Sequence, residues 1–189
     1  MQGLRDILLR FGRAKCGAVA FEAVIILPVL IWTYTASFVF FDAYRVYNSS
    51  VKATYSVADA LSRQTNTVHG YDVQGLARVF RHLIRNGETA RLRVTQIYWD
   101  GADYRVDWSF VTDNDARLFD AQMGALAHRL PPLMTNERIL LVESFVPYDP
   151  AFGMGLQFLT FENFTVTRPR YANQVPFDAS ETVPTPPGS

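Results

Sequence analysis

Few residues of this chain combine a reactive side chain with a spacing that chemistry can use. The histidines His69, His82 and His128 stand apart from one another and from Cys16, the one cysteine. Metal sites need several such ligands close together, so the pattern predicts no metal and no cofactor. The sequence also lacks a phosphate-binding loop, a dinucleotide fingerprint and a Gly-x-Ser-x-Gly motif. We therefore expect no catalytic residues and no enzyme activity.

Three aspartates lie close together in the sequence, Asp113, Asp115 and Asp120. Such a group can suggest acid chemistry or calcium binding. We interpret Asp113 and Asp115 instead as residues at the start of the helix that follows, because a helix dipole favours negative charge there. This group therefore adds no predicted metal site.

The most informative carboxylate is Glu22, the one charged side chain in an apolar run of 24 residues, 18–41. A helix of that length is about 36 Å long, enough to cross a hydrocarbon core of about 30 Å. We therefore expect a transmembrane helix surrounded by membrane lipid. A carboxylate near the bilayer centre costs on the order of 3 kcal/mol, so its presence needs a reason. One reason is a position near the membrane edge, where head groups and the helix dipole stabilise the charge.

Basic side chains flank the apolar run on its amino-terminal side. Residues 1–17 hold four of them against Asp6 alone, although the whole chain balances 18 basic with 18 acidic side chains. The positive-inside bias then predicts a cytoplasmic N-terminus and translocation of the rest. A removable secretory signal is the rival interpretation, but the run is long for one and lacks a suitable small-residue cleavage site. The zero net charge argues against a nucleic-acid partner.

The order of residues around Glu22 resembles a class III (type IV) prepilin signal: a basic leader, Gly17, four apolar residues, the glutamate and a long apolar helix. More narrowly, the stretch GAVAFEAVIILPVL, residues 17–30, is similar to the start of TadE-like (TadE/TadF/TadG) pseudopilins of the tight-adherence (Flp) pilus system. The match covers about residues 13–45 and includes the Leu-Pro pair that ends at Pro28. The resemblance implies that a prepilin peptidase cuts between Gly17 and Ala18.

The resemblance also implies a minor pilin or pseudopilin, because the major pilins of that system are much shorter. Such a protein acts in assembly of a Flp-type pilus or a related secretion apparatus. Its expected partners are the peptidase, other pilin or pseudopilin subunits and the pilus assembly platform. The implied location is the bacterial inner membrane, with the carboxyl-terminal domain in the periplasm or in a pilus. The alternative is a permanently anchored single-pass envelope protein with a binding domain or an unrecognised enzymatic domain.

Two residues of the helix have expected roles in such an assembly. Glu22 would set the axial register by neutralising the new amino group of Ala18 on a neighbouring subunit, because an unpaired buried charge is costly. Pro28 removes one helical hydrogen bond and is expected to kink the helix, with or without a role in assembly.

Beyond the apolar run the helix is predicted to continue, to about 45 residues, because apolar side chains recur at steps of three and four. The recurring residues are Tyr44, Tyr47, Val51, Tyr55, Ala58 and Leu61. We expect this stripe to seat the protein's own sheet. A linker is predicted at 64–70, short helices at 73–84 and 118–130, and strands at 91–99, 103–111, 138–147 and 160–168. The pair Asp100-Gly101 predicts a hairpin turn.

Together these elements predict an α+β fold. A long N-terminal transmembrane helix continues into a small antiparallel β-sheet domain with two short helices, which is also the general plan of pilin-like proteins. The expected organisation is a basic cytoplasmic leader at 1–17, the membrane helix at 18–41 and an envelope-facing domain at 42–172. Proline and small polar residues predict a disordered tail at 173–189.

Overall fold

The computed structural model describes residues 16–84, 88–113, 115–153 and 155–179, with side chains from residue 21 onward. These residues divide into two compact units. One comprises the described residues up to Asp42 together with Pro150–Gln157, and the other comprises Ala43–Asp149 with the described residues from Phe158 onward. Residues 1–15 of the expected leader and the expected tail from residue 180 lie outside the described residues.

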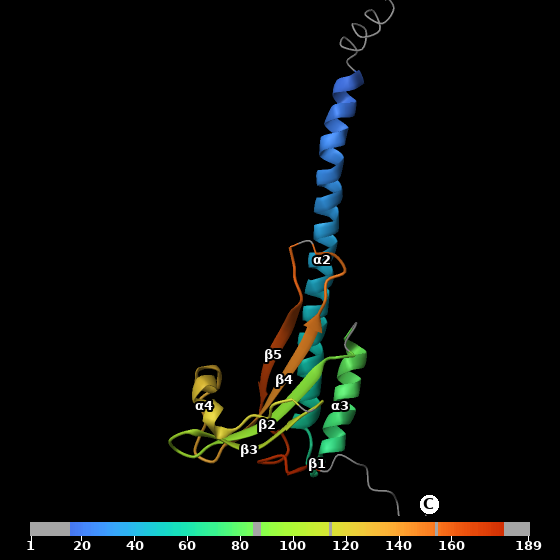
Figure 1. The fold of residues 1–189 in the computed structure, drawn as a ribbon. Coiled ribbons are helices and arrows are strands. Elements are labelled where there is room, and N and C mark those ends of the chain that lie inside the picture. The colour runs from blue at the N-terminus through green and yellow to red at the C-terminus, as the bar shows by residue number, and fades with distance from the viewer. Residues whose placement is uncertain (1–15, 85–87, 114, 154, 180–189) are drawn as a thin grey trace, which may run out of the picture. The chain divides into compact units, whose positions relative to one another are not determined.

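The first element is helix α2, Cys16–Ser62, a continuous helix of 47 residues that takes part in both units (Figure 1). At a rise of 1.5 Å per residue it is about 70 Å long. The predicted continuation of the apolar helix beyond residue 41 is therefore confirmed.

The second unit is built on a four-stranded antiparallel sheet with the strand order β3-β2-β4-β5. The strands are β2, Arg91–Trp99; β3, Tyr104–Val111; β4, Arg138–Tyr148; and β5, Leu159–Thr167. Each boundary lies within about one residue of the predicted one, because alternating side chains and turn residues mark these strands clearly. The α+β class, the long helix and the small antiparallel sheet are thus confirmed.

The two short helices are α3, Gly70–Leu83, and α4, Asp120–Leu126, which is followed by the 3₁₀ turn η1, Ala127–Arg129. Alternate side chains of β4 face two different layers. Ile139 and Leu141 pack in a buried cluster with Met123 of α4. Ser144 faces the opposite layer, where its Oγ lies 2.7 Å from Thr54 Oγ1 of α2. The sheet is therefore covered by α4 on one face and by α2 on the other.

The face of α2 that packs on the sheet differs from the predicted stripe. The side chains of Tyr44, Tyr47 and Tyr55 are 66%, 42% and 59% exposed. The buried residues of this part of the helix are Ala43, Val46, Ser50, Ala53, Thr54, Val57, Ala58, Leu61 and Ser62. The prediction was therefore wrong for Tyr44 and Tyr55 and correct for Ala58 and Leu61. Tyr47 is partly exposed, but its ring packs against Phe161 of β5 with centroids 5.6 Å apart. Small and hydroxyl-bearing side chains let the helix approach the sheet, and a hydropathy pattern counts three of these buried side chains, Ser50, Thr54 and Ser62, as polar.

The buried hydroxyl groups of α2 are satisfied by partners on the sheet. The Asn163 side chain on β5 donates from Nδ2 to Ser50 Oγ and to Ser144 Oγ, both at 2.9 Å. Thr54 Oγ1 shares the hydrogen bond with Ser144. Sliding the helix along the sheet would leave these groups buried without partners, at a cost of about 1–3 kcal/mol each. The network therefore fixes one register of α2 on the sheet.

The predicted disordered tail is wrong for residues 173–179. Strand β6, Phe177–Asp178, pairs in parallel with β1, Val68–His69, inside the segment that was predicted as a linker. Val175 is fully buried, and its N–H donates to Gln96 Oε1 at 2.8 Å. Its carbonyl accepts a hydrogen bond from Trp108 Nε1 at 2.9 Å. Pairs of two residues carry no periodic signal, so only the packing around them fixes these strands.

The turn between β2 and β3 gives a testable pH dependence. The Asp100 carboxylate accepts hydrogen bonds from the backbone N–H of Asp103 at 2.7 Å and of Ala102 at 2.8 Å, and from Arg105 Nε at 2.9 Å. These donors, the Asp103 N–H first, lower the pKa of Asp100 from 3.8 to about 2. A lowered pKa in the folded state stabilises the fold above pH 4, and this contribution is lost as the pH falls toward 2.

We therefore expect the unfolding midpoint of the wild-type protein to decrease between pH 4 and pH 2, and the Asp100→Asn variant to lose part of that decrease. Denaturant titrations of the detergent-solubilised protein at several pH values measure this dependence. The exposed Asp149→Asn variant is the matched control and should keep the wild-type slope. Identical slopes in all three proteins would contradict the assignment to Asp100.

Candidate functional site

The residues expected at the processing site lie in the first described turn of α2. This helix begins at Cys16, so the backbones of Gly17 and Ala18 are both helical. Glu22 follows Ala18 by four residues, and residues four apart share one face of a helix. The structure therefore places the expected cleavage point and the expected register residue about one turn apart on the same side of α2.

The Glu22 side chain is exposed on α2. Within the described part of the chain it has no hydrogen-bond or ion-pair partner. The carboxylate is therefore available to a group outside these residues, such as water, a lipid head group or a second protein.

The surface of α2 around Glu22 is almost entirely apolar. Its large apolar side chains between Phe21 and Phe41, Val39 apart, are 44–77% exposed, including Phe21 at 70% and Leu30 at 62%. Among the described residues, α2 is the one helix long and apolar enough to cross a membrane. An exposed apolar surface of this extent is unfavourable in water, so it needs lipid or other apolar helices around it.

Three hydroxyl side chains of this segment are satisfied within the helix itself. The hydroxyls of Thr33, Thr35 and Ser37 each donate to the carbonyl four residues earlier, at 2.8 Å. Such internal bonds are what a helix in lipid requires, because hydrocarbon offers no partner. Pro28 lies inside α2, and the helix continues through it.

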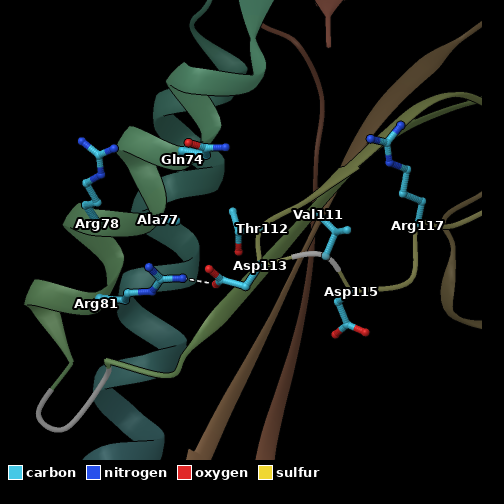
Figure 2. A pocket seen from close by; sticks show the side chains of 9 residues that line it. All are labelled: Gln74, Ala77, Arg78, Arg81, Val111, Thr112, Asp113, Asp115 and Arg117. Atoms are coloured by element: carbon cyan, nitrogen blue, oxygen red, sulfur yellow. Dashed lines mark hydrogen bonds and ion pairs between the residues drawn. The ribbon is translucent and has the colours of Figure 1, made fainter. Parts of the chain in front are cut away.

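A second place where functional groups gather is a cavity of about 440 Å³ beside α3 and the end of β3 (Figure 2). Its lining residues are Gln74, Ala77, Arg78, Arg81, Val111, Thr112, Asp113, Asp115 and Arg117. Figure 2 shows the Arg81 side chain extending from α3 toward Asp113, with which it forms an ion pair. Sequence reasoning missed this cavity because its residues come from separate segments and match no motif.

The carboxylates of this cavity correct one prediction. Asp113 pairs with Arg81 and Asp115 pairs with Arg91, whereas the following helix begins only at Asp120. Asp113 and Asp115 are therefore not helix N-terminal residues. Asp113 instead has a left-handed backbone conformation, with φ of 61°, in the loop after β3.

The cavity has little of what acid–base or nucleophilic chemistry needs. The Thr112 hydroxyl already donates to the carbonyl of Leu92 at 3.3 Å and accepts the N–H of Leu92 at 3.0 Å. The two carboxylates are neutralised by arginines. Among its described lining residues no nucleophile lies against a general base, so the arrangement is suited to binding charged groups.

The histidines and acidic residues elsewhere form no metal centre within the described residues, where no group of three or more His, Cys, Asp or Glu side chains could hold a metal ion. His69 is engaged by the fold itself. Its ring stacks on Tyr71 with centroids 4.8 Å apart, and its Nδ1 lies 3.3 Å from a carboxylate oxygen of Asp178. It therefore supports the junction of β1 and β6.

No family model, curated protein or solved structure matches this chain. A function for it must therefore be argued from its own residues. The amino-terminal half of α2 combines an exposed carboxylate, an apolar surface and internally satisfied hydroxyls, and it is the stronger of the two candidate sites.

Proposed function

We propose that this chain is a minor pilin or pseudopilin of a Flp-type (tight-adherence) pilus or a related secretion apparatus. A prepilin peptidase would remove residues 1–17, and the helix beginning at Ala18 would then join other subunits. The observation that carries this proposal is the spacing of Gly17 and Glu22 at the start of a long apolar helix, followed by a small α+β unit.

The physical properties of Glu22 support this role. Cleavage would create a positively charged amino group on Ala18. In an assembly, this group would lie beside the Glu22 carboxylate of a neighbouring helix. Pairing the two removes an unpaired charge from an apolar environment, where it costs several kcal/mol. Because an apolar helix surface can slide along another without losing contacts, one such pair would determine the axial register.

The alternative is a permanently anchored envelope protein whose second unit binds a ligand or partner. The observation that favours it is the arginine-lined cavity beside α3, which an assembly role does not require. Both functions use the apolar helix as a membrane span, and only the pilin function requires cleavage after Gly17.

Cleavage is tested by the intact mass of the protein extracted from membranes that contain an active prepilin peptidase. We expect the chain to lose residues 1–17, and we expect Gly17→Val to remain full-length because a branched side chain then precedes the cut bond. Gly3→Val changes another glycine of the same leader, far from the cut bond, and is the matched control, which should still be cut. A full-length wild-type chain beside an active peptidase would reject the pilin function and leave the anchored protein.

A further inference from the structure

The loop between β4 and β5 belongs to the same compact unit as the apolar part of α2. The described residues of Pro150–Gln157 group with the helix residues up to Asp42, and Figure 1 shows this loop, in orange, beside α2. Two side chains of the otherwise exposed helix are buried at this level, Ala36 at 9% and Val39 at 1% exposure. The loop therefore packs on the helix around these two residues.

The level of this contact follows from helix geometry. Val39 precedes Phe41, the end of the apolar run, by two residues, and Ala36 precedes it by five. At 1.5 Å per residue these positions lie about 3 Å and about 7.5 Å inside the end of the run. In a membrane-spanning helix, that level is the boundary between the acyl chains and the head groups on the side where the second unit follows.

The loop has the composition that this boundary favours. Residues 150–158, PAFGMGLQF, carry no charge, and the nearest charged residues are Asp149 and Glu162. The side chain of Phe152 is 51% exposed, and its loop groups with a helix whose surface is itself apolar. Moving an exposed aromatic side chain out of water is favourable, because it removes apolar surface from contact with water.

The backbone of the loop limits how deep it can go. Gly155 has φ of 91°, a left-handed conformation typical of an irregular turn rather than of a helix or strand. Irregular backbone leaves N–H and carbonyl groups that hydrocarbon cannot satisfy, so lipid-exposed loops do not enter the bilayer core. The hydrated interface can accommodate both these polar groups and an inserted phenylalanine.

We infer that the described residues of 150–157 form a second membrane contact, with the loop lying in the lipid interface beside α2 and Phe152 inserted between the outer ends of the acyl chains. The partner is the bilayer itself. This inference rests on the membrane span, which both candidate functions share, and on neither cleavage nor assembly.

Fluorescence quenching tests this contact in the full chain. The lone cysteine is first replaced, Cys16→Ser, and single cysteines are then introduced by Ala151→Cys in the loop, Leu30→Cys in the middle of the span and Ala102→Cys in the exposed β2–β3 turn. Each is labelled with an environment-sensitive dye in phosphatidylcholine–phosphatidylglycerol vesicles. The lipids carry a quencher either near the head group or near the acyl terminus.

We expect the shallow quencher to remove most of the emission at position 151, the deep quencher to remove most at position 30, and neither to affect position 102. Adding Phe152→Asp should abolish quenching at position 151, whereas Phe152→Trp should retain it. A circular-dichroism melt of each variant shows whether the fold is kept, and labelling through Gln157→Cys gives a second reading in the same loop.

The possible outcomes distinguish the loop contact from the membrane span and from the pilin function. If the label at position 30 is quenched and the labels at positions 151 and 157 are not, the loop contact alone is overturned. If the unquenched loop labels also show blue-shifted emission, the loop contacts a second copy of the protein instead of lipid. An unquenched position 30 overturns the membrane span and the loop contact together. Quenching at positions 30 and 151 in a chain that retains residues 1–17 beside an active peptidase supports the loop contact and rejects the pilin function.

Discussion

Replacing Glu22 with alanine is expected to abolish assembly while cleavage after Gly17 continues. The variant removes the acidic partner and leaves the Ala18 amino group unpaired in an apolar environment. Breaking one partner of a buried ion pair costs about 3–5 kcal/mol, which weakens an association on the order of a thousandfold. Assembly is measured as the amount of chain recovered in sheared surface filaments or copurified with other pilin subunits, and cleavage as the intact mass.

Two further variants show whether charge is responsible. Glu22→Gln keeps the shape and loses the charge, so it should fail in assembly as alanine does. Thr33→Val removes a polar group of the same helix whose hydroxyl bonds only the carbonyl of Val29 within the described residues, and it should assemble normally. Normal assembly of the Glu22→Ala chain would reject the pairing, and normal assembly of the glutamine variant alone would reject a role for charge.

The second large effect is expected at a buried ion pair inside the sheet. Arg93 on β2 lies directly opposite Glu143 on β4 and holds its carboxylate with two hydrogen bonds, Nε to Oε2 at 2.7 Å and Nη2 to Oε1 at 2.9 Å. The two side chains are only 16% and 9% exposed. Arg93→Met should therefore lower the free energy of unfolding by about 3–5 kcal/mol, because it leaves a buried carboxylate without its partner.

A double variant distinguishes the lost partner from lost packing. Arg93→Met combined with Glu143→Leu removes both charges and should recover most of the stability, as measured by denaturant unfolding of the detergent-solubilised protein. The control, Arg63→Met, removes an exposed pair with Asp59 on α2 and should cost less than about 1 kcal/mol. A double variant as unstable as the single one would show that packing around Arg93, and not the unpaired charge, is responsible.

Much of this fold could be predicted from the sequence because its signals are local. Alternating residues such as Tyr104, Val106 and Trp108 mark strands wherever one face is buried, and Asp100-Gly101 fixes the hairpin between β2 and β3 because Gly101, with φ of 105°, takes a left-handed conformation. The long apolar run likewise predicts α2 by composition alone. These features need no knowledge of what lies far away in the chain.

The sequence-based predictions fail where contacts between residues far apart in the sequence determine the structure. Helix α2 packs on the sheet through Ser50 and Thr54. The sequence alone marks both as exposed polar residues, but hydrogen bonds with Ser144 and Asn163 allow them to be buried. Asp113 is predicted at the start of the following helix. The sequence does not show its ion pair with Arg81, which lies 32 residues away along the chain. The candidate site shows the same division. The spacing of Gly17 and Glu22 is visible in the sequence, whereas the loop that packs beside Val39 follows only from the folded chain.

The pairing of β1 with β6 also sets a time at which the second unit can finish folding. Strand β6 follows every other described element in the chain, so a ribosome makes it after the whole sheet. Until Val175 and Phe177 arrive, Gln96 Oε1 and the Trp108 ring lack the partners that they have in the folded protein. The second unit can therefore complete these contacts only after the last described strand has been made.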